Sequence, residues 1–204
     1  MPLDLAGLLA LAAGLGWAAG LRLYTVIFVV GMAGRLGWIM LPPGLHLLEH
    51  PWVLGAAGLM LSIEFFADKI PLLDSVWDTV HTFIRIPAGA ALAAMVFGGQ
   101  GLEWQMAMAI MGGTLAAGTH FTKAGARAMI NASPEPFSNV AASFGEDIAV
   151  LGGLWLMFVH PWLMLALLLL LVAATAWLLP IVWRGVAGMI RGLSLPRSTA
   201  GSNT

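Results

Sequence analysis

Long apolar stretches follow one another along almost the whole chain, and short breaks containing Pro, Gly or charged residues separate them. A helix needs about 20 mostly apolar residues to cross the hydrocarbon core of a bilayer, so the pattern predicts about six transmembrane helices. They are expected at about 5–33, 51–66, 87–98, 104–122, 140–159 and 162–183. The third stretch is too short to cross alone and must take in residues from the segment before it.

The composition places the chain among membrane proteins. Hydrophobic residues make up 60% of its 204 positions and charged residues only 9%, whereas soluble domains carry about 25% charged residues. This difference excludes a soluble enzyme and a disordered regulator. The lack of Cys excludes thiol chemistry and disulfides, and a net charge of −1 offers no basic surface for nucleic acid. We expect an all-α, polytopic membrane helix bundle whose main partner is the lipid bilayer, with no nucleic-acid partner.

The distribution of Lys and Arg predicts the orientation of the bundle. Six spans put seven cations on one side of the membrane: Lys69, Arg85, Lys123, Arg127, Arg184, Arg191 and Arg197. Arg35 stands alone on the other side, and Arg22 lies inside the first span. Because Lys and Arg near span ends are retained in the cytoplasm, both termini are expected to be cytoplasmic, in a bacterial inner (plasma) membrane.

The chain is expected to form one transmembrane domain at 1–190, followed by a flexible polar tail at 191–204. Three spans in each of the halves 1–99 and 100–190 would give an inverted repeat, as in many transporters. The residue evidence is a short similarity between the first spans of the two halves. Coincidence in a chain with few residue types is the alternative explanation.

The segment 72–85 has two unlike faces at helical spacing. The apolar face carries Leu73, Val76, Trp77, Val80, Phe83 and Ile84, and the polar face carries Asp74, Asp78, His81, Thr82 and Arg85. This pattern predicts an amphipathic helix that lies on the cytoplasmic surface or re-enters the membrane. Its polar face is either solvated, or presents Asp74 and Asp78, one turn apart, to a divalent cation or to a metal-bound phosphate.

Other charged side chains lie within or close to the predicted spans. Glu64 and Asp68 are one turn apart at the end of the second span, next to Lys69. Arg22 lies inside the first span, where it needs a carboxylate, a backbone carbonyl or a water-filled cavity. These groups are either structural ion pairs or parts of a functional site.

One face of the fourth predicted helix carries His120, Lys123, Arg127 and Asn131. Two cations one turn apart repel each other unless anions face them. Glu146 and Asp147, or the carboxylates of the second span, are the expected counter-ions. The alternatives are a charge network that stabilises the bundle, or an anion or phosphate headgroup bound between Lys123 and Arg127.

Several motifs resemble those of a known family. They are Gly20-Leu21-Arg22, Glu64-Phe65-Phe66-Ala67-Asp68-Lys69-Ile70-Pro71, Asp74, Asp78, Thr82-Phe83-Ile84-Arg85, Pro87-Ala88-Gly89-Ala90, Thr119-His120, Lys123-Ala124-Gly125, Arg127, Asn131-Ala132-Ser133 and Glu146-Asp147. With them the chain resembles, over nearly its whole length, the bacterial membrane family named domain of unknown function 4126. Ser133-Pro134-Glu135-Pro136 departs from the more Gly-rich turn expected there. The resemblance implies a membrane location and a compact helical bundle, and it transfers no catalytic residue.

Three functions are compatible with these patterns. The first is a small transporter or channel whose ion or substrate pathway is formed by Arg22, Glu64, Asp68, Lys69, Asp74, Asp78, Arg85, His120, Lys123, Arg127, Asn131, Glu146 and Asp147. The second is a membrane enzyme that acts on a lipid phosphate with a divalent metal at Asp74 and Asp78. The third is a non-catalytic structural bundle. We expect no cofactor beyond such a cation, a small ion or anionic lipid headgroup as ligand, and a chain able to form homo-oligomers.

Overall fold

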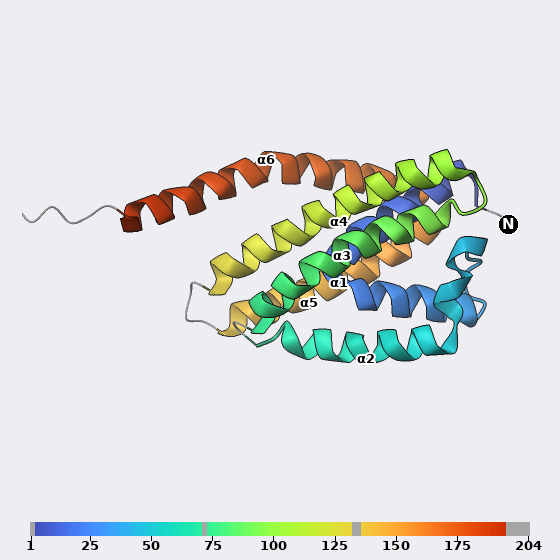
Figure 1. Cartoon of the computed structure of the whole chain (residues 1–204), viewed down its shortest axis with the longest axis horizontal. Helices are drawn as coiled ribbons and strands as arrows, with labels where there is room; N and C mark the ends of the chain where they lie inside the picture. Colours follow the sequence, from blue (N-terminus) through green and yellow to red (C-terminus); the bar gives the residue numbers. More distant parts are fainter. Residues whose placement is uncertain (1–2, 71–72, 132–135, 195–204) are drawn as a thin grey trace, which may run out of the picture.

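The computed structural model describes residues 3–70, 73–131 and 136–194, and every regular element in them is helical (Figure 1). The elements are α1 (Leu5–Arg35), the short 3-10 helix η1 (Pro43–Glu49), α2 (Pro51–Ala67), α3 (Leu73–Val96), α4 (Leu102–Asn131), α5 (Pro136–Val159) and α6 (Pro161–Ser194). This arrangement confirms the predicted all-α fold. The expected repeat of two similar halves is not seen in the described residues, because only the first half contains a broken helix and a 3-10 helix.

The helix α1 is broken at Arg22, whose backbone angles of φ −143° and ψ 75° are not helical. The first half, residues 5–21, runs parallel to α4. A Cβ on Gly16 would lie 2.6 Å from the Cα of Gly112, and a Cβ on Gly20 would lie 2.4 Å from the carbonyl oxygen of Ala116. The two backbones are therefore in direct contact, which only small residues permit.

The second half of α1, residues 23–35, turns back toward the end of the bundle at which the helix began (Figure 1). It runs antiparallel to α2, because Gly58 faces Phe28 near the middle and Gly34 faces Glu49 near the end. The expected single crossing at 5–33 is therefore wrong, and α1 is a re-entrant hairpin with Arg22 at its turn. Hydrophobic pattern does not distinguish the two arrangements, since both bury apolar residues on every side.

The reversal of α1 changes the topology of the chain. The start of α1 and the end of α6 lie at opposite ends of the bundle (Figure 1). The expectation that both termini share one side is therefore wrong for this arrangement. A helix that turns back adds no crossing, so the number of crossings between the two ends of the chain becomes odd.

Fewer helices qualify as spans than the six expected. By length and composition alone, α3 and Phe137–Val159 of α5 are long and apolar enough, and so is α1 when its two halves are counted as one helix. The pair η1 and α2, bent by 65°, gives a fourth candidate if the two form one span. In α4, Gly, Thr and Gln are mixed with the apolar residues, and the described apolar part of α6, Pro161–Trp177, is short. The structure is consistent with a helical membrane bundle with three to four candidate spans.

The segment 72–85 is not a separate interfacial or re-entrant helix. Residue 72 lies outside the described residues, and residues 73–85 form the first half of α3, which continues through Pro87 to Val96 without a break. The prediction that the third span borrows residues from this segment agrees with that continuity. The prediction of a separate amphipathic helix is therefore wrong. The amphipathic pattern instead marks the inward polar face of a spanning helix.

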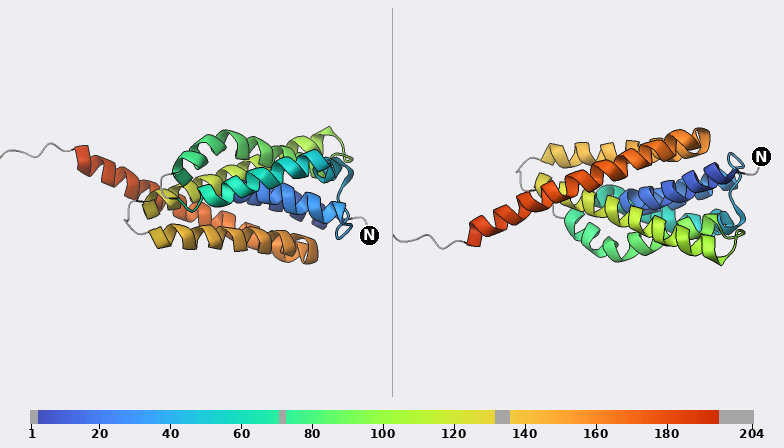
Figure 2. Two further views of the ribbon diagram at one scale, coloured as in Figure 1. Left: turned by 90° about the horizontal axis from the view of Figure 1, so that it is seen from below. Right: turned by 90° about the horizontal axis from the view of Figure 1, so that it is seen from above.

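The core of the bundle surrounds the first half of α1. Ala10, Leu11, Leu15, Ala18 and Ala19 are at most 1% exposed. This half packs among α3, α4, α5 and α6, and α6 lies across the bundle and extends beyond the other helices (Figure 2). A helix that is apolar on every side is typical of such a central position. The charged turn at Arg22 is thereby placed inside the bundle.

Candidate functional site

The helix α3 turns its polar face inward. Asp74, Asp78 and Arg85 are at most 2% exposed, whereas Phe83 is 82% and Val76 61% exposed on the opposite face. The interpretation of a solvated polar face is therefore wrong. An apolar outer face suits a helix surrounded by lipid, where unpaired polar groups are costly and must meet partners inside the protein.

Arg22, at the turn of α1, finds acidic partners on other elements, as its position inside the first stretch predicts. Its Nη1 lies 2.8 Å from Asp68 Oδ2 and its Nε lies 3.1 Å from Asp147 Oδ1. Its Nη2 donates to both the carbonyl and the hydroxyl oxygen of Ser143. A fully buried guanidinium at a helix break is thus held by α5 and by the end of α2.

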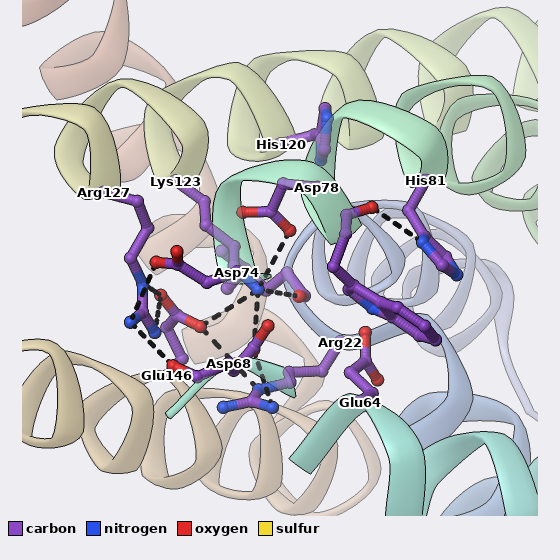
Figure 3. A network of polar contacts seen from close by, with 12 residues as sticks. Arg22, Glu64, Asp68, Asp74, Asp78, His81, His120, Lys123, Arg127 and Glu146 are labelled. Atoms are coloured by element: carbon purple, nitrogen blue, oxygen red, sulfur yellow. Dashed lines mark hydrogen bonds and ion pairs between the residues drawn. The ribbon is translucent and has the colours of Figure 1, made fainter. Parts of the chain in front are cut away.

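Lys123 of α4 connects three helices and lies at the centre of the network (Figure 3). Its Nζ lies 2.9 Å from Asp68, 3.2 Å from Glu146 and 3.5 Å from Asp78. It also donates to the backbone carbonyl of Leu21, at 3.2 Å. This carbonyl ends the first half of α1, where the helix dipole favours a positive charge.

Arg127, one turn further along α4, forms the outer part of the network. Its Nη2 lies 3.0 Å from Glu146, and its Nη1 donates to the carbonyl of Asp68 and to the side chain of Asn139. Asn131 then donates to Asp74 at 3.0 Å and accepts from Asn139. The expected pairing of the α4 cations with Glu146 and Asp68 is therefore present.

Arg85 forms the inner part of the network, between two carboxylates. Its Nη2 lies 2.6 Å from Glu64 and its Nη1 lies 2.7 Å from Asp78. Its Nη1 also lies 3.4 Å from Nδ1 of His120, whose Nε2 lies 2.7 Å from the hydroxyl of Thr82. A guanidinium can only donate, so Nδ1 accepts and the proton of this neutral imidazole is on Nε2.

The network has an excess of negative charge. Four cations (Arg22, Arg85, Lys123 and Arg127) face six carboxylates (Glu64, Asp68, Asp74, Asp78, Glu146 and Asp147). One oxygen each of Glu64, Asp68 and Asp78 is buried without a hydrogen-bond partner. Such oxygens are costly in a low-dielectric interior. The network therefore has room for protons or a small cation.

Lys69 lies at the edge of the network. Its Nζ lies 3.1 Å from the ring centre of Phe65 and 3.3 Å from Ser143 Oγ, and among the described residues it has no ion pair within 4 Å. Burial lowers the pKa of its ammonium group below the ordinary value for Lys. The cation–π contact takes the place of the ion pair suggested by the sequence.

A groove of about 250 Å³ opens between α3 and α4. Its wall includes the hydroxyls of Ser75, Thr79 and Thr82 and reaches Asp78, His120 and Arg127. Thr79 is exposed, whereas Asp78 and His120 are 2% and 1% exposed. The groove therefore connects the outside of the bundle with the buried network.

The structure brings together the side chains that the sequence singled out, with Lys69 at their edge: Arg22, Glu64, Asp68, Asp74, Asp78, Arg85, His120, Lys123, Arg127, Asn131, Glu146 and Asp147. The sequence did not identify the site roles of Ser143 and Asn139. Ser143 lies one turn before Asp147 on α5, and Asn139 one turn before Ser143, so they share the face that carries the acids. A search for that face would have found both.

The site contains no obvious metal centre. In the parts of the chain that the structure describes, no group of three or more His, Asp or Glu side chains could hold a metal ion. The candidate metal ligands have other partners: Asp74 accepts a hydrogen bond from Asn131, and Asp78 forms ion pairs with Arg85 and with Lys123.

Comparisons with other proteins identify the family. No curated protein and no solved structure matches the chain. One family model matches residues 9–181, which include every residue of the network. The chain therefore belongs to the family described as Domain of unknown function (DUF4126).

Proposed function

We propose that this protein is a small membrane transporter or channel in which an ion crosses through the charged network. One observation carries the proposal: α1 turns back inside the bundle at Arg22, and the turn is surrounded by buried ion pairs. Broken helices whose ends meet charged groups at membrane depth are the arrangement by which many transporters bind ions. Irregular backbone at that depth is tolerated only where it is buried in protein or lines a cavity.

The length of the two halves of α1 supports a position within the membrane. At 1.5 Å per residue each half is about 20–25 Å long, less than the roughly 30 Å hydrocarbon core. Neither half spans the bilayer, and both are too apolar to lie in water. The turn at Arg22 then falls within the protein, between the two membrane surfaces.

The charge distribution supports an orientation. Lys69 follows the end of α2, and Lys123 and Arg127 lie in the last third of α4. Both helices finish at the same end of the bundle, whereas α1, whose last residue is Arg35, finishes at the other end (Figure 1). Retention of cations in the cytoplasm then puts the network end on the cytoplasmic side of a bacterial inner membrane. The first residues of the chain contain no Lys or Arg, so the reversal of α1 moves the N-terminus to the outer side without changing this bias.

The excess of two carboxylates over cations favours a transported proton or small cation over an anion. The enzyme alternative has less support, because Asp74 and Asp78 face cationic and amide groups that would compete with a metal. A purely structural bundle explains the ion pairs, but it does not explain the unpartnered oxygens of Glu64 and Asp68. Anionic lipid headgroups and a second copy of the chain are proposed partners that act outside the network.

The test is ion flux in vesicles that contain the purified protein and an imposed ion gradient. We expect the wild type to dissipate the gradient, and Glu64→Gln or Asp68→Asn to reduce flux to the rate of protein-free vesicles. Glu103→Gln is the matched control, because Glu103 is exposed in the first turn of α4, and α4 begins at the end of the bundle opposite to the end of α2 (Figure 1). Wild-type flux no faster than that of empty vesicles would overturn the proposal. Flux unchanged in both variants would overturn the assignment of these carboxylates.

A further inference from the structure

Asp78 differs from Glu64 and Asp68, the other two fully buried carboxylates with an unpartnered oxygen, because it lines a groove. Glu64, Asp68 and Asp78 each have a buried oxygen with neither a hydrogen-bond partner nor an ion pair, whereas the buried Oε2 of Glu146 lies 3.2 Å from Nζ of Lys123. Asp78 is the one of these three that lines the groove between α3 and α4. Its side chain is 2% exposed and its Oδ2 has no hydrogen-bond partner, so the groove is lined by a buried carboxylate with one unused oxygen.

We propose that Asp78 is the proton-binding carboxylate of the network and exchanges its proton with water in the groove between α3 and α4. This inference rests on the proposed transport function and names its ion. A hydronium ion in the groove transfers one proton to Asp78 Oδ2 and leaves as water, and the carboxylate becomes a neutral carboxylic acid. In the return step the carboxylic acid gives its proton to a water molecule, which leaves as a hydronium ion, and the carboxylate is restored. No other reactant is needed.

The groups that face Asp78 allow this change of charge. On α3, Arg85 lies 2.7 Å from Oδ1, and on α4, Lys123 lies 3.5 Å from the same oxygen. Arg85 also pairs with Glu64 of α2, and Lys123 also pairs with Asp68 and Glu146. Neither cation therefore loses its last partner when Asp78 is protonated. Among the described residues, no charged group of α1 or α5 lies within ion-pair distance of Asp78.

The groups of α4 in the groove wall also favour a proton over a metal cation at Asp78. His120 lines the groove beside Asp78, and its neutral ring accepts from Arg85 and donates to Thr82. Thr82 in turn donates to the backbone carbonyl of Asp78, at 3.0 Å. Arg127, the remaining charged group of the wall, is already paired with Glu146. A metal cation at Oδ2 would be repelled by Arg85 and Lys123, whereas a proton forms a covalent bond and removes the charge.

The first test asks whether water fills the groove. The chain has no native Cys, so Thr79→Cys introduces a single thiol in the groove wall. Val80→Cys is the matched control, because Val80 is the next residue and is 56% exposed on the apolar face. The thiolate is the nucleophile that attacks thiol reagents, and it forms in water and not in lipid. A charged, membrane-impermeant reagent should therefore label Thr79→Cys at least about tenfold faster than Val80→Cys. Equal labelling rates would overturn the proposal.

The second test detects the proton itself, without any need for transport. Infrared difference spectra of the protein in lipid nanodiscs, between acidic and alkaline buffer, should contain a carboxylic-acid band. The band should shift when aspartate is isotope-labelled and disappear in Asp78→Asn, while Glu103→Gln leaves it unchanged. If Asp78→Asn does not fold, Asp78→Glu provides the same information, because its band no longer responds to labelled aspartate. A band that survives in Asp78→Asn, or that belongs to glutamate in the wild type, would overturn the proposal.

Flux measurements separate this inference from the transport function. A pH-sensitive dye inside the vesicles should report proton movement that does not depend on Na⁺ or K⁺. Movement of Na⁺ or K⁺ without protons would overturn the proton assignment and leave the transport function intact. If no ion moves but both the labelling and the infrared results are as expected, the transport function fails and Asp78 remains a proton-binding site.

Discussion

Two buried regions of this bundle meet at Leu21, and they differ in how their interiors are filled. On the N-terminal side of Leu21, the first half of α1 packs Ala, Gly and Leu against α4 with backbones in contact. On the C-terminal side of Leu21, Arg22 and its partners fill the interior of the bundle with charged side chains. Small apolar residues are enough for helices to associate in a membrane. Each buried charge is tolerated only if a partner offsets the free energy lost when it leaves water. The network is therefore sensitive to the loss of a single partner, which is better explained by a functional role than by stability.

Removal of the buried cation at the turn of α1, Arg22, should have the largest effect on the difference between the two regions. In Arg22→Met, the buried Asp68 loses one of its two cationic partners and Asp147 loses its partner. Breaking a buried ion pair typically costs about 3–5 kcal/mol. The free energy of unfolding in mixed detergent micelles should fall by that amount. Arg35→Met, at an exposed site with one hydrogen bond to Glu49, is the control and should stay within about 0.5 kcal/mol of wild type. Equal losses of unfolding free energy in both variants would show that the buried network is no more sensitive to the removal of a cation than the exposed surface is.

A substitution in the apolar region should have a smaller effect. A Cβ on Gly16 would lie 2.6 Å from the backbone of Gly112, which cannot move aside as a flexible side chain can. Overpacking of this kind costs about 1–3 kcal/mol, so Gly16→Ala should lower stability in the same unfolding assay by that amount. Gly125→Ala on α4 meets no atom within 4 Å and should leave stability unchanged or slightly raised. A Gly16→Ala protein as stable as the Gly125→Ala protein would contradict the close contact of α1 with α4.

The boundary between the two regions depends on single hydrogen bonds, and these should have the smallest effect. The hydroxyl of Thr119 lies 2.9 Å from the carbonyl of Trp17, near the end of the first half of α1. Hydrogen bonds between membrane helices average about 0.6 kcal/mol, so Thr119→Val should lose about that much unfolding free energy. Thr114→Val is the control, because that hydroxyl bonds only within α4, to Ile110. A loss above about 2 kcal/mol would place Thr119 in the network.

Much of the network can be predicted from helical spacing. The two faces of α3 and the cations of α4 each repeat every three or four residues. Arg22 needs a partner wherever it lies in a membrane span, so its pairing with an acid is also predictable. The direction of the polar face of α3 is not, because periodicity shows that two faces differ and does not show which one meets lipid.

The reversal of α1 could not be predicted from the sequence. A straight helix and a hairpin of two half-helices have the same apolar residues, and Arg22 is a single interruption in either case. The distinction depends on contacts such as Tyr24 with His81 and Gly31 with Leu48, which involve residues far away along the chain. Cation counting did not reveal it either, since the N-terminal segment contributes no Lys or Arg.

The folded-back α1 also constrains the order in which the protein is assembled during synthesis. Arg22 bonds to Ser143, 121 residues later in the chain, and its carboxylate partner Asp147 comes later still. When α1 leaves the ribosome, neither of its short halves can span the bilayer and the arginine has no counter-charge. Although α1 is made before α5, it must therefore reach its final position only after α5 has entered the membrane.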